Sequence, residues 1–69
     1  LIEPRELPAT YPEFAEPARN CRYDGCLHAS EPGCAVRDEV ERGTIPPLRY
    51  EQYRRLLDEV IEAYRNRYR

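Results

Sequence analysis

The sequence lacks several residue types, and each absence excludes a class of protein. None of its 69 residues is Lys, Met or Trp. Without Lys the chain cannot contain the phosphate-binding loop G-x-x-x-x-G-K-[ST], so any nucleotide chemistry must come from elsewhere. No apolar run approaches the ~18 residues of a membrane span and no leader opens the chain, so we expect a soluble protein without membrane contact. Because the first residue is Leu and Met is absent, we also expect a fragment of a longer polypeptide.

Apolar residues are scarce for folding a chain of this size. Hydrophobic residues make up 41% of the sequence, and the formal net charge is −2. Ordering each residue costs ~1.5 kcal/mol, which the burial of so little apolar surface barely offsets. We therefore expect one small domain that an additional cross-link holds together.

The first part of the chain is rich in proline. Four of the seven prolines fall within residues 1–20, which predicts an irregular lead-in with short helical turns. Leu7, Tyr11 and Phe14 recur at helix-like spacing, and we expect all three to contact the core.

Two helices are predicted after the lead-in, and no alternating run indicates a strand. A short helix is expected over about 33–42, where Ala35, Val36 and Val40 form an apolar stripe that ends before Gly43. A longer amphipathic helix is expected over about 48–67. Its apolar face consists of Tyr53, Leu56, Leu57, Val60, Ile61, Tyr64 and Tyr68. The predicted fold class is therefore a small all-α, loop-rich domain.

The loop before the first helix holds every cysteine and the only histidine. Cys21, Cys26, His28 and Cys34 form the pattern C-x4-C-x-H-x5-C. Zinc favours such a Cys3His set, and four protein ligands leave no position for an activated water, so we expect a structural zinc site and no catalytic residue. We also expect Cys34 to open a helix whose positive end lowers the pKa of its thiol.

Other uses of these cysteines remain open at this stage. A small chain can instead be cross-linked by a disulfide, but one disulfide would leave the third cysteine unpaired. An iron–sulfur centre or plain thiols are further alternatives. Zinc is favoured because it uses all three cysteines and accounts for His28 as well.

The residues around this cluster resemble the C-terminal zinc domain of the ribosome small-subunit-dependent, circularly permuted GTPases of the RsgA/YjeQ type. The segment at 11–14 looks like the connection between their GTPase and zinc domains. Gly25 departs from the family, which often has an acidic residue before the second cysteine. The resemblance rests on the segments at 21–28, 31–36 and 43–45, together with Arg49, Tyr50 and Tyr53.

The resemblance implies a larger parent protein with an OB-type barrel, a permuted GTPase domain and this zinc-bearing end. Residues 1–20 would then be the lead-in from the missing GTPase domain, and residues 21–69 the zinc domain. GTP and Mg²⁺ would bind only in the missing domain, so the parent would hydrolyse GTP while this fragment would not. The family acts in the cytoplasm during late assembly of the 30S subunit, and its members imply Cys21, Cys26, His28 and Cys34 as zinc ligands.

Arginines supply all the positive charge that could contact the ribosome. The candidates are Arg19, Arg22, Arg37, Arg65, Arg67 and Arg69. The last three also fit a solvated helix end, where cations complement the dipole. Two functions are therefore predicted for a monomeric module. Either it docks the parent on 16S rRNA and ribosomal proteins, or it is a structural clamp against the GTPase domain or another protein, without RNA contact.

Overall fold

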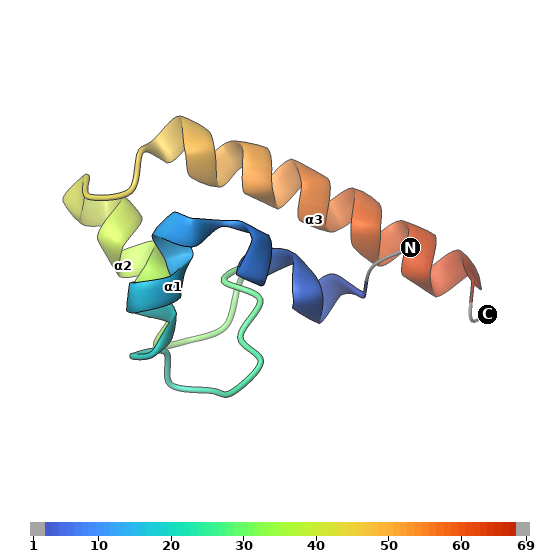
Figure 1. Cartoon of the computed structure of the whole chain (residues 1–69), viewed down its shortest axis with the longest axis horizontal. Coiled ribbons are helices and arrows are strands. Elements are labelled where there is room, and N and C mark those ends of the chain that lie inside the picture. Colours follow the sequence, from blue (N-terminus) through green and yellow to red (C-terminus); the bar gives the residue numbers. More distant parts are fainter. Residues whose placement is uncertain (1–2, 68–69) are drawn as a thin grey trace.

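The computed structural model describes residues 3–67, which form four helical elements (Figure 1). In chain order they are a 3-10 helix η1 (Pro4–Thr10) and three α-helices, α1 (Pro12–Ala18), α2 (Ala35–Arg42) and α3 (Pro47–Arg67). No strand occurs among these residues, so the predicted small all-α, loop-rich fold is confirmed. Within the same residues, no helix is both long and apolar enough to cross a membrane.

The proline-rich lead-in is ordered as two short helices that belong to the core. Prolines open both η1 and α1, where their fixed φ suits the first turn and their missing N–H costs nothing. Leu7, Tyr11 and Phe14 are buried, as predicted from their spacing. The domain boundary after residue 20 stays a prediction, although residues on both sides of it share this core.

Helix α2 starts at Ala35, two residues later than predicted. Gly33 has φ +73°, in the left-handed region, and Cys34 is extended with φ −80° and ψ 111°. Neither conformation continues into a helix, so Cys34 becomes the residue that precedes the first turn. The helix ends at Arg42 because Gly43 takes a left-handed conformation with φ +85°.

Helix α3 is the long element that lies across η1 and α1, and it begins one residue before the predicted position 48 (Figure 1). Tyr53 and Leu57 are fully buried on its inner face, as the periodicity predicts. Leu56 was expected on the same face but is 40% exposed, because it lies at the edge of the contact with the shorter helices. Tyr68 lies outside the described residues.

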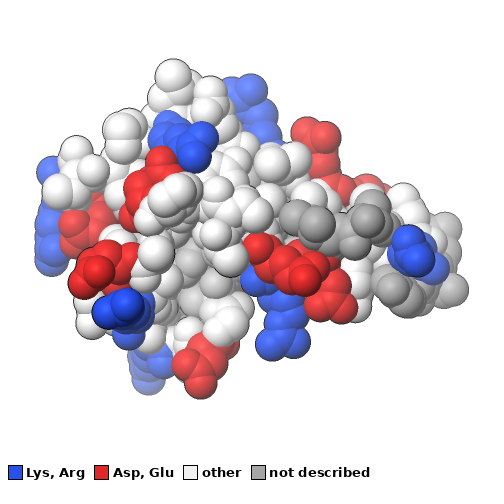
Figure 2. Space-filling view, viewed as in Figure 1, with Lys and Arg blue, Asp and Glu red and all other residues white. Residues whose placement is uncertain are grey.

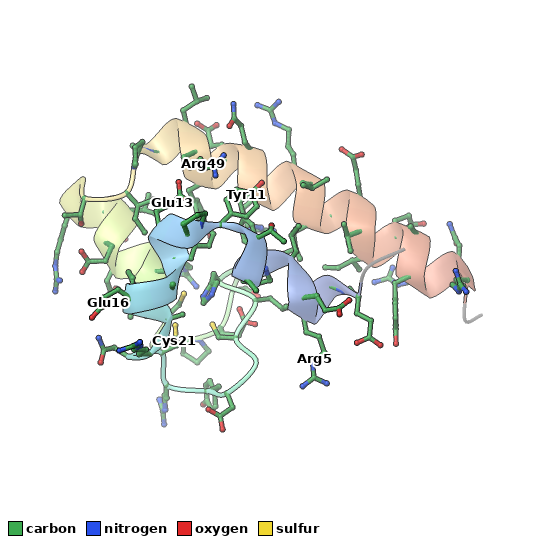
Figure 3. All side chains as sticks on the ribbon, in the orientation of Figure 1. Arg5, Tyr11, Glu13, Glu16, Cys21 and Arg49 are labelled. Atoms are coloured by element: carbon green, nitrogen blue, oxygen red, sulfur yellow. The ribbon has the colours of Figure 1, made fainter. Side chains whose placement is uncertain are left out.

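An aromatic cluster fixes α3 against α1. The Phe14 and Tyr53 rings meet edge to face with centroids 4.9 Å apart, and Tyr11 contacts both rings. Above them, Nε of Arg49 donates to the Glu13 carboxylate at 2.7 Å, and its guanidinium lies 4.4 Å from the Tyr11 ring centroid (Figure 3). These contacts hold the long helix beside the loop that carries the cysteines.

Candidate metal centre

The structure brings the four predicted ligand residues into one cluster. The sulfur atoms of Cys21, Cys26 and Cys34 and a ring nitrogen of His28 all lie within 4.8 Å of one another. His28 and Cys34 are buried, while Cys21 and Cys26 are partly exposed. In a tetrahedral site with bonds of about 2.0–2.3 Å, neighbouring ligand atoms are separated by about 3.7 Å. The cluster therefore has the size and composition to hold one metal ion.

The ring of His28 faces the sulfurs through Nδ1. This nitrogen lies 3.4 Å from Sγ of Cys34 and 3.6 Å from Sγ of Cys21. The backbone of His28 has φ +61°, a conformation that costs about 1–3 kcal/mol for a non-glycine residue. Its backbone N–H also donates to Sγ of Cys26 at 3.3 Å. The geometry thus identifies Nδ1 as the nitrogen available to a metal, which the sequence could not specify.

The three cysteines are free, and no disulfide joins any two of them. All three sulfurs instead face one ring nitrogen, so the arrangement suits a shared cation better than a covalent pair with a spare thiol. Three soft sulfur donors and one imidazole nitrogen match the preference of zinc.

Two tyrosine hydroxyls from α3 hold the backbone around His28. Tyr53 donates to the carbonyl of Leu27 at 2.6 Å, and Tyr50 donates to the carbonyl of His28 at 2.5 Å. Sequence reasoning assigned neither tyrosine a role toward the loop. The signal that could have indicated such a role is a Tyr on the inner face of a helix, because a buried Tyr hydroxyl needs a hydrogen-bond partner.

Glu31 is a third residue whose role sequence reasoning missed. Its carboxylate accepts hydrogen bonds from the backbone N–H groups of Leu27 at 2.8 Å and Ala29 at 3.0 Å. Burial raises the pKa of Glu31, but these N–H groups outweigh that effect and hold the pKa below its ordinary value. The ionised carboxylate therefore closes the turn that carries His28.

Burial sets the protonation of the cluster when no cation is present. It raises the pKa of Cys26 to about 12, and it also raises the pKa of Cys34. The backbone N–H groups at the start of α2 lower the pKa of Cys34, as expected, but burial outweighs them and the net shift is upward. Burial lowers the pKa of His28, which keeps the imidazole neutral. Thiols in such surroundings lose their protons only when a metal cation binds to the sulfurs.

The candidate contact arginines fall into separate places. Arg19 and Arg22 are exposed beside the loop, whereas Arg37 is partly buried and donates to the carbonyl of Glu31 at 3.1 Å. Arg65 and Arg67 are exposed at the end of α3, away from the loop (Figure 1). Arg69 lies outside the described residues. The structure therefore brings only the first three close to the metal centre.

The view in Figure 2 shows basic and acidic side chains interspersed over this face. No single continuous basic surface covers the part of the face that the structure describes. Any contact with a polyanion on this side would therefore depend on a local site.

Comparisons with known proteins give a consistent result, although no family model matches the chain. The small ribosomal subunit biogenesis GTPase RsgA of Geobacillus sp. (strain WCH70) is 51% identical over 61 residues, which cover 88% of this chain and 21% of the relative. The protein of the same name from Clostridium botulinum (strain Eklund 17B / Type B) is 43% identical over 68 residues, or 99% of this chain and 23% of the relative. The chain thus spans about a fifth of the curated relatives it matches.

A solved structure shows the same fold. The crystal structure of YloQ, described as a circularly permuted GTPase, superposes with a TM-score of 0.86 at 39% sequence identity. The match covers 90% of this chain and 22% of the YloQ chain.

Proposed function

Because this chain is homologous to the C-terminal part of the small ribosomal subunit biogenesis GTPases named RsgA, we propose that it is the zinc-stabilised module through which such a GTPase docks on the 30S subunit. The observation that carries the proposal is the Cys3His cluster, which lies within the matched segment of these relatives. The module acts in the cytoplasm, on 16S rRNA and ribosomal proteins, during late maturation of the small subunit. GTP and Mg²⁺ belong to the GTPase domain of the parent protein.

Zinc is the proposed cofactor, held by Cys21, Cys26, His28 through Nδ1, and Cys34. Four protein ligands close the shell, so the metal supplies cross-linking rather than catalysis. Native mass spectrometry should find one zinc per chain, and X-ray absorption should find three sulfurs at about 2.3 Å and one nitrogen at about 2.0 Å. A purified chain that is compact and carries no zinc would contradict the assignment.

Docking on RNA predicts strong salt dependence. Replacing an arginine that neutralises an rRNA phosphate should weaken 30S binding and reduce the slope of log K against log salt by about 0.7–0.9. The variants are Arg19→Ala, Arg22→Ala and Arg37→Ala in the parent protein, and Arg65→Ala tests the helix end. Arg55→Ala is a matched control, because Arg55 is exposed on α3 and has no ion pair within residues 3–67.

The alternative is a structural clamp that contacts the GTPase domain and no RNA. Two exposed apolar residues on α3 favour it, since Leu48 is 61% exposed and Leu56 is 40% exposed. Large apolar side chains on one side of a helix are typical of a surface that packs against protein. If the arginine variants bind 30S particles like the wild type at every salt concentration, while Leu48→Ser and Leu56→Ser weaken GTPase-domain contact, the clamp replaces the docking proposal.

A further inference from the structure

A cavity lies between the two N-terminal helices and the metal-binding loop. It is partly open to solvent, and its volume of about 490 Å³ is within the range of small-ligand pockets. One wall comes from η1, a second from α1, and the third from the loop at residues 23–25. Its floor includes Phe14, His28, Cys21 and Cys26, so it opens onto the metal centre.

Two arginines from different elements line this cavity. Arg5 belongs to η1 and extends on the side of the loop (Figure 3), and Arg19 follows the last residue of α1. Both are exposed, and neither side chain has a hydrogen bond or an ion pair with another residue in the range 3–67. Asp24 is the acidic residue that also lines the cavity. Two cations without carboxylate partners are therefore available to an anionic ligand.

Several of the other lining residues are small and apolar. Pro8, Ala9, Ala15 and Ala18 line the helical side and carry no large side chain that would fill the space. Tyr23 lines the loop side and is 47% exposed. Walls of this kind accept a planar aromatic ring, and an aromatic side chain adds a stacking surface.

The floor decides how an anionic ligand would be oriented. Three thiolates and one Zn²⁺ together carry a charge of −1, so a phosphate is repelled from the floor and attracted to the rim. An aromatic ring can occupy the interior, because it carries no charge. The cavity thus separates a place for a planar base from a place for its phosphates.

We propose that this cavity receives one unstacked nucleotide of single-stranded RNA, with its base between the alanine wall and Tyr23 and its phosphates against Arg5 and Arg19. The inference rests on the proposed docking function and names the RNA feature that is recognised. A duplex keeps its bases stacked inside, so it cannot deliver one into the cavity, whereas a loop or bulge can.

The test uses the zinc-loaded chain and two fluorescent probes, a mixed-sequence 12-nucleotide single strand and the duplex of the same sequence. The wild type should bind the single strand at least tenfold more tightly than the duplex. Ala15→Leu fills the cavity without changing charge, so it should weaken single-strand binding about tenfold and leave the salt slope unchanged. Tyr23→Ala should have a similar effect by removing the stacking surface, and it provides a second variant if Ala15→Leu disturbs folding.

The arginine variants test the rim separately. Arg5→Ala and Arg19→Ala should each weaken single-strand binding and reduce the salt slope by about 0.7, the value for one phosphate contact on a single strand. Arg55→Ala, on the exposed side of α3 and away from the cavity, should change neither quantity.

The outcomes separate the two proposals. If the wild type binds the single strand but Ala15→Leu and Tyr23→Ala bind it equally well, the cavity assignment is overturned and the docking function stands. Equal binding of single strand and duplex also overturns the cavity assignment. If neither the chain nor its parent binds RNA or 30S particles at any salt concentration, the docking function fails first.

Discussion

Different interactions hold helix α3 and the loop at residues 21–34, which carries the candidate metal ligands (Figure 1). Helix α3 has 21 residues, and apart from its first and last turns its backbone hydrogen bonds form within the helix. The loop at residues 21–34 has no helix or strand, and side chains satisfy several of its backbone groups. Tyr50 and Tyr53 donate to two of its carbonyls, and Glu31 accepts from two of its N–H groups. The loop therefore depends on its ligands and neighbours, whereas the helix depends mainly on one buried face.

Metal removal should give the largest effect and should affect the loop first. Structural zinc contributes an apparent ~10–16 kcal/mol in small modules, more than the stability of a typical domain. Because His28 and Cys34 lie in the same core as Tyr53, we expect a chelator to abolish the near-UV circular dichroism of the tyrosines. Part of the far-UV helical signal should persist, since α3 is long enough to retain some helix.

Re-addition supplies the control for this experiment. Zn²⁺ should restore the near-UV signal, and Mg²⁺ should not, because thiolate and imidazole donors suit zinc rather than a hard cation. A metal-free chain with an unchanged near-UV spectrum would show that the loop, like the helix, orders itself.

The hydroxyl of Tyr53 should give the next largest effect, because it links the two regions. Tyr53→Phe keeps the fully buried ring but removes the hydroxyl that donates to the carbonyl of Leu27, which costs about 1–3 kcal/mol. Tyr50→Phe should cost less, since Tyr50 is only partly buried and water can replace its hydroxyl. Denaturant unfolding of the zinc-loaded chain measures both changes.

Tyr23→Phe is the matched control, because Tyr23 is exposed and its hydroxyl has no partner within residues 3–67. It should leave the free energy of unfolding unchanged within about 0.5 kcal/mol. Equal effects of Tyr53→Phe and Tyr23→Phe would mean that α3 supports the loop through ring packing alone.

Sequence periodicity predicted the helices better than it predicted the loop. The stripes at Val36 and at Tyr53 and Leu57 gave the correct inner faces, because local spacing determines which residues share a helix face. The metal-ligating residue types were also evident, since three cysteines and one histidine occur within 14 residues.

The loop's supports could not be predicted because they join residues far apart in the chain. Tyr53 lies 26 positions from Leu27, and Tyr50 lies 22 positions from His28. Such pairs are set by how the helices pack, which no local pattern encodes. The late start of α2 depended on the conformation of Gly33, and the exposure of Leu56 depended on where the contact with the short helices ends.

Two glycines test how tightly the loop is packed. Gly33 and Gly25 have nearly the same φ, +73° and +72°, so alanine is strained by a similar amount at either position. A Cβ at Gly33 would lie 2.7 Å from Cβ of Arg22, whereas a Cβ at Gly25 meets nothing within 4 Å. We expect Gly25→Ala to cost about 1–2 kcal/mol and Gly33→Ala to cost at least 1 kcal/mol more.

The double variant Gly33→Ala with Arg22→Gly separates the clash from the strain. It removes the Cβ that the new methyl group would meet, so part of the cost should be recovered in denaturant unfolding. No recovery would mean that the close approach of Arg22 does not limit the packing of the loop.

The ion pair between Glu13 and Arg49 should give the smallest effect, and it belongs to the helix rather than to the loop. The hydrogen bond from Arg49 holds the pKa of Glu13 below its ordinary value of 4.5. A lowered pKa in the folded state contributes stability above the unfolded value and loses it as the pH falls through the folded value. The difference in melting temperature between wild type and Glu13→Gln should therefore stay constant from pH 8 to pH 6, and it should shrink with added salt.

Over that same pH range the loop should behave differently. Zinc binding releases thiol protons, so acid competes with the metal, and zinc affinity should fall steadily from pH 8 to pH 6. Measuring both quantities on one set of samples compares the two regions directly. Glu16→Gln is the control, because the Glu16 side chain is exposed and its carboxylate has no partner within residues 3–67. If the Glu13→Gln difference varied with pH in parallel with zinc affinity, the contact between α3 and α1 would depend on the metal, and the two regions would form one cooperative unit.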